Sequence, residues 1–282
     1  MARPLEGLTA IVTGAARGIG RTLAFGLLEA GCRVTLMDVA ADTLGATVEE
    51  ARTRFGHDQL LAATGDVASE RDAHRTVDET RRAFGGLDAL VNNAGVGRAF
   101  VRADVMRNPY RLWELTPTQW RRFFEVHVHG FFNMTQAALP TLLAQRHGRI
   151  VTVTTSLDHM IRAGSAGYGS AKAAMEASMA ILAEELAGTG VTANVLVPGG
   201  PVNTPGVPDD GTIPRSAFIQ ADVMVPPLRW LLSGAADGVS GRRFIAARWD
   251  ASKPPEDAAL AAGAPVAWPQ LGRQAIMPAG LR

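Results

Sequence analysis

Short apolar runs alternate along this chain with longer segments whose apolar residues recur at helical spacing. The runs are residues 8–13, 33–38, 60–65, 87–92, 149–154, 191–197 and 242–247. They are apolar at successive positions, as expected for strands of a parallel sheet that helices cover on both faces. The alternation therefore predicts a doubly wound α/β fold with a seven-stranded parallel sheet in three α/β/α layers.

Two regions depart from this alternation. Residues 97–117 form a long connection with four arginines, and loops of this length are commonly lids, binding loops or disordered segments. From residue 251 onward, prolines recur amid alanine and glycine. We therefore predict one domain over residues 1–250 and an irregular C-terminal arm over residues 251–282, either packed on a partner subunit or mobile.

Composition narrows the possible partners. The 28 basic and 27 acidic residues give a formal net charge of +1, which supplies no electrostatic argument for binding nucleic acid or a membrane surface. The N-terminus lacks the apolar segment of a signal peptide, and no apolar run is long enough to span a bilayer. The single cysteine, Cys32, excludes an internal disulfide, so we expect a soluble cytoplasmic protein.

A glycine-rich turn follows the first predicted strand. The sequence TGAARGIG, residues 13–20, leads directly into an apolar helical pattern. Glycines permit a tight turn and a close approach to a pyrophosphate, while the free amides and dipole of the helix N-terminus attract the anion. This context favours a dinucleotide site over an ordinary strand-to-helix turn.

Asp38 ends the second predicted strand, about 20 residues beyond the glycines. A carboxylate there can accept hydrogen bonds from the adenosine ribose and repels a 2′-phosphate, so NAD is favoured over NADP. Arg17, within the turn, keeps NADP as the alternative because it could help to bind that phosphate. Asp38 could also act as the N-cap of the next helix.

Several motifs in this order resemble the short-chain dehydrogenase/reductase family over roughly residues 5–250. They are TGAARGIG at 13–20, GDV at 65–67, NNAG at 92–95, YGSAK at 168–172 and VPGG at 197–200 followed by Thr204. The resemblance implies a Rossmann-type NAD(P)-binding domain. It assigns cofactor contacts to Gly14, Arg17, Gly18, Ile19, Gly20, Asp38, Asp66, Val67, Asn93, Ala94, Gly95, Tyr168, Lys172, Pro198, Gly199, Val202 and Thr204.

Tyr168 and Lys172 are four residues apart, so on a helix they share one face. A nearby ammonium favours the phenolate, and we expect Lys172 to lower the pKa of Tyr168 and make it a usable acid/base. By family spacing, Thr155 stands where a serine is usual, with Ser156 beside it. Either hydroxyl could polarise a substrate carbonyl, and strand alternation allows only one of them to serve.

The segment EVHVHG contains His127 and His129 within a helix predicted over residues 116–145, which begins at Thr116 and Pro117. Residues two apart point in different directions on a helix and no ligand cluster accompanies them, so we expect no metal site. The resemblance places His127 where the family has an asparagine that completes a proton path to the active-site lysine. His127 either keeps this relay or only fills the core, and His129 is assigned to packing or the surface.

These observations predict an NAD-dependent oxidoreductase that interconverts a secondary alcohol and a ketone through Tyr168. A nucleotide-binding sensor or scaffold without turnover, and a lyase or epimerase on the same fold, are the alternatives. The resemblance implies a homotetramer or homodimer built on helices 116–145 and 168–187. The arginines at 98, 102, 107 and 111 could recognise an acidic substrate group or could simply be solvated charges. The Pro-Gly loop has one residue more between its proline and Thr204 than is common in the family, so the resemblance does not fix how Val202 and Thr204 contact the nicotinamide.

Overall fold

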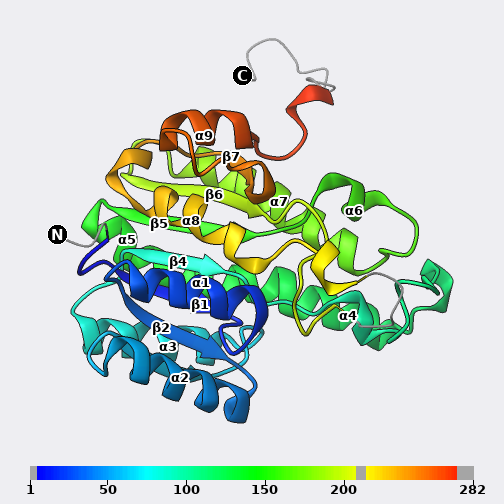
Figure 1. The fold of residues 1–282 in the computed structure, drawn as a ribbon, viewed down its shortest axis with the longest axis horizontal. Helices are drawn as coiled ribbons and strands as arrows, with labels where there is room; N and C mark the ends of the chain where they lie inside the picture. Colours follow the sequence, from blue (N-terminus) through cyan, green and yellow to red (C-terminus); the bar gives the residue numbers. More distant parts are fainter. Residues whose placement is uncertain (1–4, 208–213, 272–282) are drawn as a thin grey trace.

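The computed structural model of the chain describes residues 5–207 and 214–271. Its centre is one eight-stranded sheet in the order β3-β2-β1-β4-β5-β6-β7-β8 (Figure 1). The strands are β1 (Thr9–Thr13), β2 (Arg33–Asp38), β3 (Leu60–Thr64), β4 (Ala89–Asn92), β5 (Gly148–Val153), β6 (Val191–Val197), β7 (Arg242–Ile245) and β8 (Gly263–Pro265). The strand order reverses between β1 and β4, which is where ligands bind in open α/β sheets.

Helices cover both faces of the sheet, as the apolar strands require. Side chains of α1 (Gly18–Glu29), α2 (Ala41–Phe55) and α8 (Val225–Leu232) form one hydrophobic core. Those of α3 (Glu70–Phe84), α5 (Gly130–Gln145) and α7 (Tyr168–Glu185) form the other. Successive residues of β1 point into opposite cores: Val12 packs in the core with α1, α2 and α8, and Ile11 packs in the core with α3, α5 and α7. The Rossmann-type three-layer fold is confirmed.

The sheet has eight strands where the sequence predicts seven. The seven predicted strands all form and run parallel, and β8 pairs antiparallel to β7 with Phe244 opposite Gly263. The segment GAP has no alternating apolar pattern, and only its backbone pairing with a neighbour makes it a strand.

The C-terminal segment differs from the irregular arm expected after residue 250. Residues 255–262 form α9 (Pro255–Ala262), which leads straight into β8. Pro255 occupies the first turn, where a helix needs no amide donor, so the proline does not prevent the helix. Residues 272–282 of the expected arm lie outside the described residues.

The helix predicted over residues 116–145 is continuous but not uniform. It comprises α4 (Pro117–Phe124), a π-helical segment at Glu125–His129 and α5. Thr116 caps it as expected, since its hydroxyl accepts from the amide of Gln119, whose side chain accepts from the Thr116 amide in return. Segments of π-helix often occur at functional sites, and this one contains both histidines.

The long connection before this helix is ordered by specific contacts. It contains short 3₁₀ turns at Arg98–Phe100 and Leu112–Glu114, and Arg102 pairs with Glu114 at 2.8 Å. Tyr110 is fully buried and donates its hydroxyl to the carbonyl oxygen of Ala166 at 3.0 Å. The connection is thereby fastened to the loop between the short helix α6 (Leu157–Ile161) and α7.

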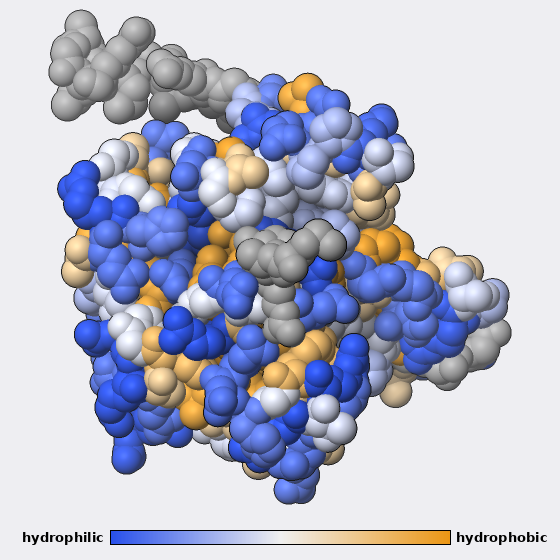
Figure 2. Space-filling model, turned by 60° about the vertical axis from the view of Figure 1, so that its left-hand side comes forward, coloured by the Kyte–Doolittle hydropathy of each residue, from blue (hydrophilic) through white to orange (hydrophobic). Residues whose placement is uncertain are grey.

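Hydrophilic side chains cover most of the face drawn in Figure 2, with apolar areas between them. None of the helices in the described ranges combines the length and the hydropathy that crossing a membrane requires.

Candidate active site

The turn between β1 and α1 is closely packed around its glycines. Gly14 has a φ of +65°, and a Cβ on Gly20 would lie 2.0 Å from the carbonyl oxygen of Gly14. A side chain at either position would displace the backbone. The helix that follows begins without a side-chain cap and without an acidic residue in its first turn. Its free amides can therefore face an anion.

Thr13 connects this turn to the end of β4 across the point where the strand order reverses. Its Oγ1 accepts hydrogen bonds from the backbone amides of Asn93 and Ala94, both at 3.0 Å. The side-chain amide of Asn93 donates in return to the carbonyl oxygen of Thr13 at 2.9 Å. These bonds hold two walls of one cleft in a fixed relation.

A cleft of about 530 Å³ lies over the glycine turn. The sequence-predicted cofactor residues that line it are Gly14, Arg17, Gly18, Ile19, Gly20, Asp38, Asp66, Val67, Asn93, Ala94, Gly95 and Thr204. Most of the predicted set is thus brought together from the ends of five strands, β1, β2, β3, β4 and β6.

Asp38 performs a structural task in this cleft as well as lining it. One carboxylate oxygen accepts from the amide of Ala16 and the other from the amide of Ala40, each at 3.0 Å. Arg17 is exposed on the same cleft. A carboxylate and a guanidinium therefore stand at the same cleft, so its lining alone does not decide between NAD and NADP.

Arg122 also lines the cleft, and sequence reasoning missed it. Its guanidinium forms an ion pair with Asp66 at 3.2 Å, while the other oxygen of Asp66 accepts from the amide of Ala68 at 3.0 Å. Arg122 lies 56 residues from Asp66 in the chain, and no motif surrounds it. The fold brings Arg122, on α4, to Asp66, in the segment that follows β3.

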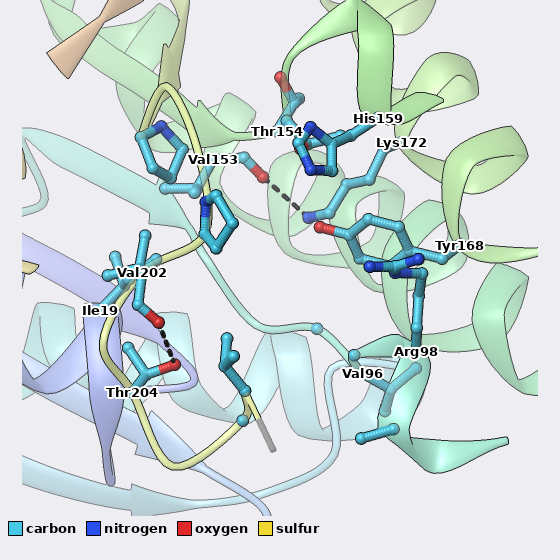
Figure 3. A pocket seen from close by; sticks show the side chains of 18 of the residues that line it. Ile19, Val96, Arg98, Val153, Thr154, His159, Tyr168, Lys172, Val202 and Thr204 are labelled. Atoms are coloured by element: carbon cyan, nitrogen blue, oxygen red, sulfur yellow. Dashed lines mark hydrogen bonds between the residues drawn. The ribbon is translucent and has the colours of Figure 1, made fainter. Parts of the chain in front are cut away.

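A second cavity of about 270 Å³ shares part of its wall with the first, including Ile19, Asn93, Gly95 and Thr204. The predicted catalytic residues Tyr168, Lys172, Thr155 and His127 all line it. Figure 3 shows the side chains of Tyr168 and Lys172 reaching into it from α7, with the hydroxyl of one close to the amine of the other. The nucleotide cleft and the candidate catalytic groups thus form one continuous site.

Burial, more than the neighbouring charges, sets the titration of these two groups. Lys172 is 4% exposed, its Nζ donates to the carbonyl oxygen of Val153 at 2.9 Å, and burial lowers its pKa to about 7. Burial also raises the pKa of Tyr168, with the Thr155 hydroxyl and Arg98 acting in the opposite direction.

We expected from the sequence that Lys172 would lower the pKa of Tyr168, whereas burial raises that pKa above its ordinary value and Lys172 is not among the groups that lower it. The tyrosine is enclosed, so removal from water disfavours the phenolate. Lys172 is buried too, and because its pKa is lowered to about 7, only part of the amine is protonated near neutral pH. The cation that lowers the Tyr168 pKa in this structure is Arg98.

The two candidate hydroxyls face different surroundings. Thr155 lines the catalytic cavity and contacts Tyr168, whereas Ser156 is not part of the cavity wall. The Ser156 hydroxyl lies 2.8 Å from Nδ1 of His159 at the start of α6. The geometry therefore favours Thr155, in agreement with the family spacing.

His127 is 1% exposed and lies between Val96 and Tyr168. Its Nε2 is 3.0 Å from both the amide nitrogen and the carbonyl oxygen of Val96, while Nδ1 has no hydrogen-bond partner among the described residues. Burial and, secondarily, Lys172 hold the pKa of His127 well below its ordinary value. The imidazole is therefore neutral at physiological pH. His129 is exposed, as expected.

The Pro-Gly loop closes the cavity from the other side. Pro198, Val202 and Thr204 line it, and Thr204 side-chain atoms lie 3.3 Å from the position that a Cβ of Gly18 would occupy. Gly199 lines neither cavity, because it packs against Ile245 and Ala247, with a φ of +105°. Its predicted cofactor contact is the one that the structure does not bring to the site.

The outer wall of the catalytic cavity carries the guanidinium of Arg98 and the imidazole of His159. Arg98 belongs to the loop arginines noted from the sequence, whereas His159, from α6, was missed because nothing in the sequence connects it to the motifs. Among the described residues, no group of three or more His, Cys, Asp or Glu side chains could hold a metal ion.

A family model for short chain dehydrogenases matches residues 8–210. The (2S)-((R)-hydroxy(phenyl)methyl)succinyl-CoA dehydrogenase subunit BbsD of Thauera aromatica is 34% identical over 195 residues, which are 69% of this chain and 73% of that protein. The 3-oxoacyl-(acyl-carrier-protein) reductase FabG of Escherichia coli K12 is 32% identical over the same shares of the two chains.

Solved structures agree with the sequence matches. The 3-ketoacyl-(acyl-carrier-protein) reductase of Brucella melitensis, solved in complex with NADH, superimposes with a TM-score of 0.72 and 25% identity. The match covers 84% of this chain and 95% of that one.

Proposed function

This chain belongs to the short-chain dehydrogenase/reductase family, and on that premise we propose that it is an NAD(H)-dependent oxidoreductase interconverting a secondary alcohol and a ketone. The observation that carries the proposal is the common cavity of Tyr168, Lys172 and Thr155, which continues into the cleft over the glycine turn. The relatives named above are dehydrogenases or reductases, and one was solved with NADH.

The cleft fits a dinucleotide. Its floor is a glycine turn with no room for a Cβ at Gly20, and the uncapped N-terminus of α1 offers amides to a pyrophosphate. The residues that would hold the cofactor are those of the glycine turn, Asp38, Asp66, Asn93 and the Pro-Gly loop. When bound, the nicotinamide supplies or accepts the hydride.

The side chains of this protein would manage the proton and the substrate oxygen. In ketone reduction, the Tyr168 hydroxyl gives its proton to the carbonyl oxygen as the carbon gains the hydride, and the reverse transfer accompanies alcohol oxidation. The Thr155 hydroxyl donates a hydrogen bond to the same oxygen and holds it in place. Lys172, whose Nζ donates to the carbonyl oxygen of Val153, would hold a ribose hydroxyl of the bound cofactor with a further N–H.

We favour NAD over NADP because Asp38 lines the cleft as a carboxylate whose position is held by two backbone amides. A 2′-phosphate would face this charge, and the exposed Arg17 would offset only part of the repulsion. A reducing compartment agrees with Cys32, which is buried with the pKa of its thiol raised by burial to about 12. Because a single cysteine leaves the chain without an internal disulfide, it suits a reducing environment, and we place the protein in the cytoplasm.

The test is turnover of a panel of secondary alcohols and ketones, followed through the absorbance of the reduced nicotinamide with NAD(H) and NADP(H) in parallel. We expect turnover with preference for NAD(H), and loss of at least about a hundredfold in kcat for Tyr168→Phe with NADH binding retained. Tight NADH binding without turnover of any panel member would contradict the proposal and support a sensor or scaffold. Product formation without net cofactor oxidation would indicate a lyase or epimerase.

A further inference from the structure

The four arginines of the 97–117 connection have different positions, and only Arg98 lines the catalytic cavity. Arg102 pairs with Glu114. Arg111 is exposed at the start of a 3₁₀ turn. Arg98 donates to the carbonyl oxygen of Gly164 at 3.2 Å and approaches the sulfur of Met106 at 3.6 Å. Within the described ranges it forms no ion pair with a carboxylate.

Arg98 is accompanied by two further basic groups. His159 lines the same cavity, and its Nε2 lies 3.4 Å from a guanidinium nitrogen of Arg162. Burial and, secondarily, the charges of Arg162 and Arg98 lower the pKa of His159, which places the three groups close to one another and disfavours a charged imidazole. The acidic residue of α6, Asp158, is exposed and does not line the cavity. The outer end of the cavity therefore carries the positive charge of Arg98, which no acidic side chain of its wall neutralises.

This charge lies next to the reacting atoms. Figure 3 shows the guanidinium of Arg98 beside the ring of Tyr168, and the charge of Arg98 acts to lower the Tyr168 pKa against the larger effect of burial. A partly buried guanidinium without a carboxylate is costly in the free protein and is relieved by a bound anion. Its planar fork matches the two oxygens of a carboxylate.

The remaining wall limits the size of the substrate. Val105, Met106, Val202 and Val207 provide apolar surface around the basic end. The whole cavity measures about 270 Å³, and in the proposed function the nicotinamide ring occupies part of it. The space that remains suits a short molecule whose polar groups are a carbonyl at one end and an anion near it.

We propose that the substrate is a short hydroxy or oxo acid whose carboxylate pairs with Arg98 beside His159 while its carbonyl or hydroxyl oxygen faces Tyr168 and Thr155. This inference rests on the proposed oxidoreductase function. In this inference, Arg98, which lies outside the Tyr-x-x-x-Lys motif, recognises the negative charge of the substrate.

The test compares 2-, 3- and 4-oxo acids with their methyl esters as substrates, using NADH and three proteins: the parent, Arg98→Gln and Arg111→Gln. Arg111 is the matched control, because the same charge is removed from the same connection outside the cavity. We expect the parent to prefer at least one acid over its ester by about tenfold or more in kcat/KM. Arg98→Gln should lower this acid-to-ester ratio by about tenfold, and Arg111→Gln should leave it unchanged.

A second measurement separates this inference from the proposed function. Calorimetry with butanoate and pentanoate, in the presence of NADH, reports carboxylate binding without turnover. Binding that Arg98→Gln abolishes, with no ketone reduced by any of the proteins, would support the anion site and defeat the oxidoreductase proposal. Two results would overturn the anion site and leave the oxidoreductase proposal standing. One is that the parent turns over the esters as fast as the acids. The other is that the acid-to-ester ratio of kcat/KM is the same in the parent and in Arg98→Gln.

Discussion

The imidazole of His127 stands perpendicular to the phenol ring of Tyr168, with an interplanar angle of 89° and the ring centroids 5.6 Å apart. One imidazole nitrogen contacts the backbone of Val96, and the other is buried without a partner among the described residues. The structure shows no hydrogen bond between His127 and Lys172 in the part of the chain that it describes. A relay through His127 would therefore need a water molecule at Nδ1.

This arrangement separates the two interpretations of His127. If it serves a relay, His127→Asn should keep most of the activity, because an amide also offers a donor and an acceptor, whereas His127→Leu should lose about tenfold in kcat. If it only fills the core, leucine should serve at least as well as asparagine. Steady-state kinetics across pH shows which of the two variants has the higher kcat.

The pH profile supplies the control for that experiment. Because burial and Lys172 hold the His127 pKa well below its ordinary value, the imidazole is neutral from mildly acidic pH upward. In both variants, the activity should therefore rise and fall at the same pH values as in the parent, and only the maximum of kcat should differ. A limb that disappears in His127→Leu would mean that His127 itself titrates in the working range.

Lys172 should destabilise the cofactor-free protein increasingly as the pH falls. Its folded pKa is about 7, against an unfolded value of about 10.4, so folding disfavours the ammonium. The penalty is absent above the unfolded pKa, grows as the pH falls towards the folded pKa, and stays complete below it. Its size is on the order of a few kcal/mol.

Lys172→Met removes this penalty and also leaves the Val153 carbonyl oxygen without its donor, a cost that does not depend on pH. We therefore expect the melting temperature of the variant, relative to the parent, to be higher at pH 6.5 than at pH 10 by roughly 5 °C or more. Differential scanning calorimetry at the two pH values measures this. An equal difference at both would contradict the lowered pKa.

The sequence predicts the positions of the main catalytic candidates because local features determine them. Tyr168 and Lys172 share a face of α7 by helical spacing, and Thr155 lies two residues after the end of β5. The carboxyl ends of parallel strands meet at one edge of the sheet, so motifs widely separated in sequence meet there as well.

The features that the sequence does not predict depend on burial or on distant packing. The direction of the Tyr168 pKa follows from its enclosure and from Arg98, which belongs to another segment. Strand β8 has no strand-like pattern and forms by pairing with β7. His159 and Arg122 reach the site only through the placement of α6 and α4, and no motif marks either residue.

Helices α5 and α7 leave an apolar groove open between them, and we predict that a second copy of this chain covers it. The groove measures about 660 Å³, and its wall includes Phe132 and Ile181, which are 63% and 60% exposed. Large apolar side chains grouped on one face mark an interface. These are the helices that the family resemblance assigns to a homodimer or homotetramer.

Phe132→Glu and Ile181→Glu should each reduce the assembly to smaller species in sedimentation velocity, because each places a charge in the apolar contact. Leu260→Glu is the matched control, since Leu260 is 76% exposed on α9, away from the groove. A parent protein that sediments as a monomer at micromolar concentration would contradict the prediction.

Glu176, which is buried, forms an ion pair with Arg243, whose side chain is 14% exposed. The carboxylate is 2% exposed and Oε1 lies 2.8 Å from Nε of Arg243, while Oε2 accepts from the Thr154 hydroxyl at 2.8 Å. The guanidinium also donates to the carbonyl oxygen of Thr155 at 3.1 Å. The pair therefore holds the segment that presents the Thr155 hydroxyl to the cavity.

Removing one partner of this pair should be costly, because it leaves the other charge buried. We expect Glu176→Ala to lower the free energy of unfolding by about 3 to 5 kcal/mol in urea titrations, whereas Glu49→Ala, which breaks the exposed pair with Arg52, should cost less than about 1 kcal/mol. Arg243→Leu together with Glu176→Leu should recover much of the stability, since neither charge then remains unpaired. If Glu176→Ala and Glu49→Ala lowered the free energy of unfolding equally, the pair of Glu176 with Arg243 would contribute no more to stability than an exposed pair.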